Sequence, residues 1–140
     1  MFRVLLMLIG LSLAPAAWGD LADLLGDASQ VLSPQQAFGP QLAAGADGQL
    51  ELRFEIAPGH YLYRDRLVAT DASGAAVSLD LPAGEPHDDP DSGHVMVLRG
   101  PQRIALGIPA RPGAGVDVRY QGCAEGRLCY APVRAHLQLP

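Results

Sequence analysis

Residues 49–56 alternate polar and apolar side chains without exception, and this pattern limits the possible folds more than any other feature of the chain. The apolar positions share one face of an extended strand: Leu50, Leu52, Phe54 and Ile56. A strand with one apolar and one polar face needs a second layer over its apolar side. The pattern therefore predicts a half-buried strand in a layered antiparallel sheet.

Further short strands follow at regular spacing, separated by Gly and Pro turns. They are predicted over residues 60–70, 77–81, 94–99, 104–108, 116–120 and 128–139. Residues 82–93 carry three Pro, two Gly and four acidic residues, which predicts an exposed loop. Short helices are expected over residues 20–30 and, from a capping Ser33 followed by Pro34, over residues 33–36. Together these predict an all-β fold, an immunoglobulin-like antiparallel β-sandwich.

The first nineteen residues have the layout of an export signal. Arg3 precedes an apolar run over residues 4–13, and small residues follow, with cleavage expected after Ala16 or Gly19. The run is too short to cross a bilayer, and no later segment is apolar enough to do so. We therefore predict a signal peptide at residues 1–19, a single periplasmic domain over residues 20–140, and no membrane span in the mature chain.

The charge of the chain argues against one class of partner. Its formal net charge is −5 at pH 7, and all ten basic residues are arginine. Cleavage of the signal peptide removes Arg3, which makes the mature chain more acidic still. A chain with this balance is poorly suited to the phosphate backbone of nucleic acid, so no nucleic acid is expected among its partners.

The two cysteines, Cys123 and Cys129, are predicted to form a disulfide, because an exported chain enters an oxidising compartment. If the strands around them form a hairpin, the two residues face each other with Cα atoms roughly 4.5 Å apart, within the range that a disulfide tolerates. Closing so short a loop is worth only about 2 kcal/mol of stability. Chemistry alone leaves a structural staple and a redox pair open.

The neighbours of the cysteines favour the redox pair. The runs Tyr-Gln-Gly-Cys-Ala at residues 120–124 and Cys-Tyr-Ala-Pro at residues 129–132 closely resemble the cysteine segment of the N-terminal periplasmic domain of the reductase DsbD. The resemblance continues in Gly-His-Tyr-Leu-Tyr-Arg at residues 59–64, and more weakly at residues 34–38 and 87–93. It covers nearly the whole mature chain, in order.

This resemblance implies an immunoglobulin-like thiol:disulfide interchange domain with protein-disulfide reductase activity. Such domains carry reducing equivalents between thioredoxin-like periplasmic partners through transient mixed disulfides, in electron transport that serves cytochrome c biogenesis. The resemblance assigns the intermolecular bond to Cys129 and its resolution to Cys123. Full reductases of the family continue into membrane and thioredoxin-like domains, whereas this sequence stops at Pro140. Electrons are therefore expected from a separate membrane reductase.

The same resemblance identifies supporting residues and one departure. The tyrosines and the acid that line the family's cysteine site match Tyr61, Tyr63 and Asp89. An acid beside a thiol disfavours the thiolate, so Asp89 is expected to exchange protons or restrain reactivity. The family's cap loop, which shields the disulfide with an aromatic residue, matches four residues that include no aromatic: Pro90, Asp91, Ser92 and Gly93. Shielding is then left to Met96, His94 or another loop residue, or the disulfide is more exposed.

Two other classes of function remain as alternatives. One is a non-catalytic binding sandwich with a structural hairpin disulfide. The other is a copper-handling module, because His87, His94, Met96 and the cysteines are soft ligands. Their spacing matches no compact motif, so no metal and no cofactor are expected. A hydrolase is disfavoured because the sequence contains no Gly-x-Ser-x-Gly elbow.

Overall fold

The computed structural model describes residues 31–140. The predicted signal peptide, the domain start at residue 20 and the helix predicted over residues 20–30 therefore lie outside the described residues. Within the described part, no helix has both the length and the apolar character that crossing a bilayer requires.

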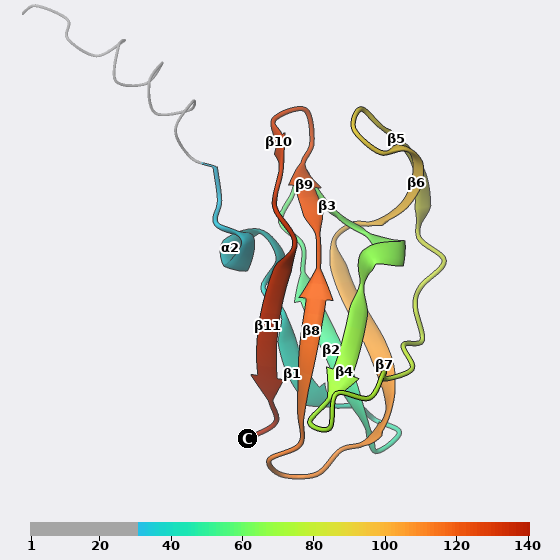
Figure 1. The fold of residues 1–140 in the computed structure, drawn as a ribbon, viewed down its shortest axis with the longest axis vertical. Coiled ribbons are helices and arrows are strands. Elements are labelled where there is room, and N and C mark those ends of the chain that lie inside the picture. The colour runs from blue at the N-terminus through green and yellow to red at the C-terminus, as the bar shows by residue number, and fades with distance from the viewer. Residues whose placement is uncertain (1–30) are drawn as a thin grey trace, which may run out of the picture. The chain divides into compact units, whose positions relative to one another are not determined.

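The regular secondary structure of the described chain consists mostly of strands (Figure 1). In order they are helix α2 (Pro34–Phe38), β1 (Gln41–Ala44), β2 (Gln49–Glu55), β3 (His60–Tyr63), the 3-10 turn η1 (Arg64–Arg66), β4 (Val68–Asp71), β5 (Glu85–Asp89), β6 (Gly93–Leu98), β7 (Pro101–Pro109), β8 (Gly115–Tyr120), β9 (Gly122–Ala124), β10 (Leu128–Cys129) and β11 (Val133–Gln138). All of the strand pairs are antiparallel. The all-β prediction is confirmed.

The strands form two layers around one core. One layer is the sheet β1-β2-β7, and the other contains β11-β8-β4. That second layer continues at one end as β10-β9-β3, in the same order, and is extended there by β6 and β5 (Figure 1). This arrangement is the predicted immunoglobulin-like β-sandwich, and it places the cysteine strands β9 and β10 at one end of the sandwich.

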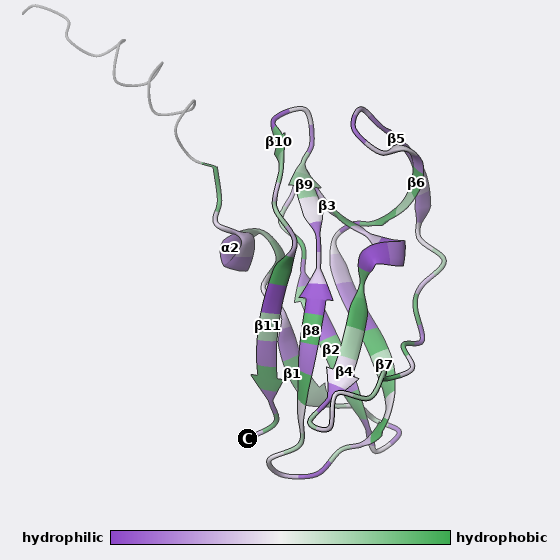
Figure 2. Ribbon diagram, viewed as in Figure 1, coloured by the Kyte–Doolittle hydropathy of each residue, from purple (hydrophilic) through white to green (hydrophobic). Residues whose placement is uncertain are grey.

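The core follows from the alternation in β2. Leu50, Leu52 and Phe54 are fully buried, and the intervening side chains point outward. Across from them lie Val116, Val118 and Tyr120 of β8, which alternate in the same way. The hydropathy colouring shows this mixture of apolar and polar positions along the strands (Figure 2). Burial of these apolar side chains supplies the main driving force for folding.

The predicted helix at residues 33–36 is confirmed as α2. Ser33 caps it by accepting a hydrogen bond from the Gln36 backbone N–H, and the Gln36 side chain accepts one from the Ser33 backbone N–H. Gly39 ends the helix in the left-handed conformation. Phe38 is thereby directed into the core, where its ring packs against Tyr120.

The loop predicted over residues 82–93 is only partly correct, because this segment also contains a strand. Residues 85–89 form β5, which pairs with β6 in a hairpin. Pro86 and the charged side chains gave no strand signal, but β5 lies at the edge of its sheet. Edge strands tolerate proline and charge because one side of their backbone needs no partner.

Three strand predictions also need correction. Residues 60–70 are two strands, because η1 separates β3 from β4. Residues 128–139 are likewise divided between β10 and β11. Residues 77–81 form no regular strand and make only an isolated bridge from Leu79 to Leu106. The short strand β1 was not predicted.

Replacing Tyr120 by phenylalanine is expected to stabilise the domain. The Tyr120 hydroxyl is buried and has no hydrogen-bond partner among the described residues. Its ring contacts Phe38 and Phe54, and those contacts need no hydroxyl. Removing an unpaired buried polar group should raise the free energy of unfolding by about 1 kcal/mol, measured by urea denaturation. A loss of stability instead would show that the hydroxyl has a partner, such as a bound water.

Candidate active site

The cysteines face each other at the end of the β9–β10 hairpin, as predicted. Cys129 is the register partner of Cys123, and the two form a disulfide with a Cα–Cα distance of 4.0 Å. The connecting turn is closed by a hydrogen bond from the Arg127 N–H to the Ala124 carbonyl, and Gly126 takes a positive φ of 70°. A tight turn therefore fixes the bridge at the tip of the hairpin.

The two sulfurs sit in different surroundings. Strand β9 lies between β10 and β3, where Cys123 pairs with Tyr61, and Cys123 is only 1% exposed. Strand β10 is the edge of the sheet, and Cys129 is exposed. A reacting partner therefore reaches Cys129 before Cys123.

Beneath the disulfide, β3 and β5 contribute a buried hydrogen-bond network. The hydroxyls of Tyr61 and Tyr63 donate to Oδ2 of Asp89 at 2.5 and 2.8 Å. Oδ1 of Asp89 accepts the backbone N–H groups of Asp91 and Ser92 at 2.9 and 2.8 Å. Asp89 is the only buried charged residue in the described part of the chain, at 4% exposure. The structure thus brings together the three side chains selected from the sequence.

The network holds Asp89 in its charged form. Burial alone raises the pKa of this carboxyl, but the four hydrogen bonds that it accepts outweigh burial and hold its pKa at about 2. Burial and the adjacent carboxylate raise the pKa of Tyr61 well above its usual range, and mainly burial raises that of Tyr63. At neutral pH both tyrosines keep their protons, and Asp89 is a carboxylate.

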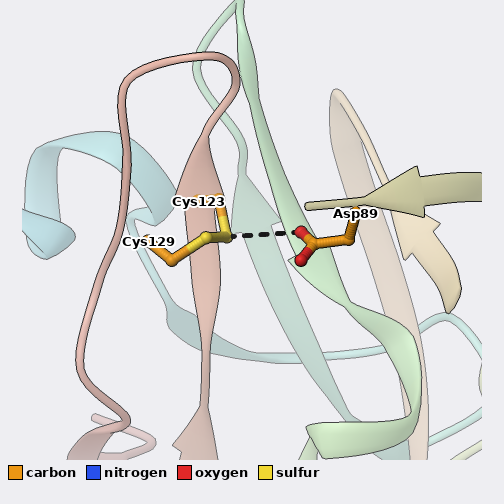
Figure 3. A group of neighbouring side chains, drawn as sticks. All are labelled: Asp89, Cys123 and Cys129. Carbon is orange, nitrogen blue, oxygen red and sulfur yellow. Dashed lines mark hydrogen bonds between the residues drawn. A yellow bond between two sulfur atoms is a disulfide. The ribbon is translucent and has the colours of Figure 1, made fainter. Parts of the chain in front are cut away.

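The network also touches the disulfide. The Tyr63 hydroxyl oxygen lies 3.1 Å from Sγ of Cys123 and 3.5 Å from Sγ of Cys129. Oδ2 of Asp89 lies 4.0 Å from Sγ of Cys123 (Figure 3). Once the bridge opens, a negative charge on Cys123 is disfavoured by this carboxylate. Cys123 is therefore suited to hold a proton, and Tyr63 is placed between both sulfurs and the acid.

A cleft of about 430 Å³ opens onto the disulfide. Pro90 and Asp91 of the cap loop line it together with the turn between the cysteines. Met96 and His94, which the sequence offered as shields, are not among the lining residues. His94 instead contacts Asp88 at the surface, with 2.6 Å between Nδ1 and Oδ1. No aromatic cap-loop side chain covers the sulfurs, and Cys129 stays exposed.

Two arginines that the sequence did not single out lie against the tyrosines. The Arg66 guanidinium is 3.9 Å from the centre of the Tyr63 ring, and that of Arg99 is 5.0 Å from the Tyr61 ring. Arg99 also forms ion pairs with Glu85 and Glu125, so it connects β5 to the cysteine turn. The two ion pairs of Arg99 join residues that are 14 and 26 positions apart, so no local sequence pattern predicts them.

The potential metal ligands gather differently from the set considered in the sequence. In the described chain, the ligand atoms that lie within 4.8 Å of one another belong to Asp89, Cys123 and Cys129. The two sulfurs are bonded to each other, so neither is a thiolate ligand in this oxidised form. His87 lies against the Tyr61 ring instead, with ring centres 4.6 Å apart.

Comparison with known proteins identifies the family. The sequence profile described as "Thiol:disulfide interchange protein DsbD, N-terminal" matches residues 28–139. The chain belongs to the DsbD N-terminal domain family. It is 39% identical over 114 residues to the thiol:disulfide interchange protein DsbD of Cronobacter sakazakii, a match that covers 79% of this chain and 20% of that protein. It is 38% identical over 138 residues to DsbD 2 of Pseudomonas aeruginosa, covering 97% and 23%. The chain thus spans about a fifth of the length of these curated relatives.

Solved DsbD N-terminal domains share the fold. The Neisseria meningitidis domain, crystallised in the reduced form, is 30% identical with a TM-score of 0.65, covering 78% of this chain and 89% of that one. The same family's domain in a complex with the PilB N-terminal domain, also from Neisseria meningitidis, is 30% identical with a TM-score of 0.59, covering 78% and 87%. The expected family and its immunoglobulin-like fold are confirmed.

Reducing the disulfide is expected to leave this DsbD-type domain folded. The bridge closes a hairpin whose cysteines are six residues apart, so its loop-entropy contribution is only about 2 kcal/mol. The main core lies elsewhere, between β2, β7 and β8. In urea denaturation, the oxidised and the reduced protein should each unfold in one cooperative transition, and their free energies of unfolding should differ by about 2 kcal/mol. Unfolding on reduction would instead mark the bridge as a structural staple.

Proposed function

We propose that this domain carries out periplasmic thiol–disulfide exchange, passing reducing equivalents between thioredoxin-like partners through a reversible Cys123–Cys129 disulfide. The observation that carries the proposal is the asymmetry of the bridge. Cys129 is an exposed residue on an edge strand, whereas Cys123 is buried beside a carboxylate and a tyrosine. Membership of the DsbD N-terminal family supports the same reaction.

The proposed exchange begins at Cys129. A partner thiolate attacks Sγ of Cys129, the Cys123–Cys129 bond breaks, and its electron pair leaves on Sγ of Cys123, which takes up a proton. The partner's second thiolate then attacks the partner sulfur of the mixed disulfide and releases Cys129. The partner ends as a disulfide and this domain as a dithiol, so two electrons have moved. In the reverse direction, Cys123 resolves the mixed disulfide.

The buried network favours the protonated form of Cys123 that this step produces. The Tyr63 hydroxyl is 3.1 Å from Sγ of Cys123, and Asp89 accepts a hydrogen bond from that hydroxyl. We propose that the Asp89 carboxylate and the Tyr63 hydroxyl stabilise the protonated Cys123 thiol, whose proton comes from solvent, and that Tyr61 positions Asp89. Because Asp89 disfavours a thiolate at Cys123, the reduced domain presents Cys129 as its nucleophile.

We also propose that the protein is exported to the periplasm. The pattern of residues 1–19 supports a cleaved signal peptide, and the family to which the chain belongs supports the periplasm as its compartment. Its exchange partners are thioredoxin-like proteins or domains. No metal or cofactor takes part in the proposed reaction.

The test is a redox equilibration from both sides. Oxidised domain is mixed with a reduced periplasmic thioredoxin-like domain, and reduced domain with the oxidised partner, followed by alkylation and mass spectrometry. Exchange predicts the same thiol ratio from both directions. If the cysteines of this chain stay oxidised while the partner stays reduced, the bridge is a structural staple. The PilB N-terminal domain is a second probe, because it forms a complex with a similar domain.

A further inference from the structure

We propose that Arg66 is a positioning residue that tethers the cap loop (residues 90–93) beside the disulfide and so limits access to the sulfurs. The proposal rests on the proposed function, because it concerns how readily the disulfide reacts. In this chain, polar contacts from Arg66 would hold a cap loop that contains no aromatic side chain.

The Arg66 side chain contacts three residues around the disulfide at once. Its Nη2 donates to Oγ of Ser92 in the cap loop at 2.8 Å. Its Nη1 donates to Oε1 of Gln121, between β8 and β9, at 2.9 Å. Between these bonds the guanidinium lies on the Tyr63 ring. A planar guanidinium with donors in a fixed geometry can hold two acceptors and stack on a ring simultaneously, which a lysine cannot.

The cap loop is fixed from two sides. On the inner side, Asp89 accepts the backbone N–H groups of Asp91 and Ser92. On the outer side, the Ser92 hydroxyl takes the bond from Arg66 and lies 3.5 Å from the Tyr63 hydroxyl. Pro90 and Asp91, adjacent to these anchors, form a wall of the cleft over the disulfide. Releasing the outer anchor should therefore let that wall move away from the sulfurs.

The tether differs from the link that Arg99 makes across the site. Arg99 pairs with the carboxylates of Glu85 and Glu125 and connects β5 to the cysteine turn. Among the described residues, the hydrogen bonds of Arg66 go to two neutral side-chain oxygens, those of Ser92 and Gln121. Loss of Ser92 Oγ therefore weakens the tether without changing any charge near the cysteines. This property separates a tethering role from an electrostatic one.

The test is the rate at which a neutral phosphine, tris(hydroxypropyl)phosphine, reduces the disulfide. The phosphorus attacks a sulfur and the S–S bond breaks. Water supplies the oxygen of the phosphine oxide and the two thiol hydrogens, so the reaction balances without a protein partner. Ser92→Ala removes one hydrogen bond to a charged group and should speed reduction about threefold. Arg66→Met also removes the bond to Gln121 and the contact with the Tyr63 ring, and should speed reduction about fivefold. The double variant should be no faster than Arg66→Met, because both changes release one tether.

Matched controls keep the result specific. Arg134→Met removes an exposed arginine from β11, and Ser78→Ala removes an exposed serine away from the cleft; both should match wild type. Arg66→Lys should lie between wild type and Arg66→Met. Rates of Arg66→Met and Ser92→Ala equal to these controls would overturn the tether, as would fully additive effects. If Arg66→Met does not fold, the charge-neutral Ser92→Ala decides. The phosphine assay uses no partner, so a wild-type failure to exchange with thioredoxin-like domains would reject the proposed function separately.

Discussion

Replacing Gly122 by alanine is expected to destabilise the domain by about 3 kcal/mol or prevent folding, the largest loss that we expect from a single methyl group. A Cβ atom at this position would lie 2.6 Å from Cζ and 2.8 Å from Cε1 of Phe38, and closer still to the Tyr61 carbonyl oxygen. Phe38 is fully buried and packed edge-on against Tyr120 and Tyr130, so it has no room to retreat. The Tyr61 carbonyl belongs to the β3–β9 pairing that positions Cys123.

Urea denaturation measures this loss, and Gly107→Ala is the matched control. Gly107 also lies in a strand and has no positive φ, and its Cβ would meet Ser78 Cβ at an ordinary 3.5 Å. The control should therefore stay within about 0.5 kcal/mol of wild type. Adding Phe38→Leu to Gly122→Ala should recover part of the loss by removing the clashing ring atoms. A Gly122→Ala variant as stable as wild type would mean that β3 and β9 are not packed as closely as described.

Asp89→Asn is expected to cost about 2–3 kcal/mol at pH 7, because the replacement cannot satisfy the four donors that surround Asp89. Each carboxylate oxygen accepts two hydrogen bonds. An asparagine keeps one oxygen and presents an NH₂ group in place of the other. In one orientation of the asparagine side chain, its NH₂ group faces the tyrosine hydroxyls. In the other orientation, the NH₂ group faces the two backbone N–H groups. In both cases, a buried part of the network loses its acceptors.

The cost should depend on pH in a defined direction. The folded-state pKa of Asp89 is about 2, below its ordinary value of 3.8, so the carboxylate stabilises the fold above pH 5 and loses that contribution as the pH falls toward 2. A difference of this size corresponds to about 2 kcal/mol. The stability gap between wild type and Asp89→Asn should therefore narrow by about 2 kcal/mol between pH 5 and pH 2. Asp91→Asn, at an exposed position, serves as the control. An unchanged gap would show that Asp89 is not held ionised by this network.

The fold was predictable where the signal was local. Alternation in β2 and the capping residues of α2 each decide a conformation through neighbours a few positions away, and both predictions were confirmed. The cysteine hairpin belongs to the same class, since its turn and its register lie within one short segment. By contrast, β5 was missed because an edge strand accepts residues that a central strand rejects.

The candidate site was predictable only in part. The cysteines followed from chemistry and context, whereas Tyr61, Tyr63 and Asp89 were selected by resemblance, and the structure places them within hydrogen-bonding distance. Arg66 and Arg99 were missed because they act across the fold. The bond from Arg66 to Ser92 spans 26 residues, and nothing in the sequence around either residue indicates it. Their contacts depend on where η1, the cap loop and the cysteine turn meet.

The most direct test of the exchange reaction asks which cysteine bonds to a partner. Reduced Cys123→Ala and Cys129→Ala variants are each mixed with a thioredoxin-like domain that keeps only its attacking cysteine, activated as a mixed disulfide with 5-thio-2-nitrobenzoate. A free thiolate displaces the thionitrobenzoate anion, so its colour reports the rate and a gel reports the covalent complex. We predict a rapid complex with Cys123→Ala, which keeps the exposed Cys129, and little or none with Cys129→Ala, which keeps the buried Cys123. Equal trapping of both variants, or trapping through Cys123 alone, would contradict the assignment of Cys129 as the sulfur that meets the partner.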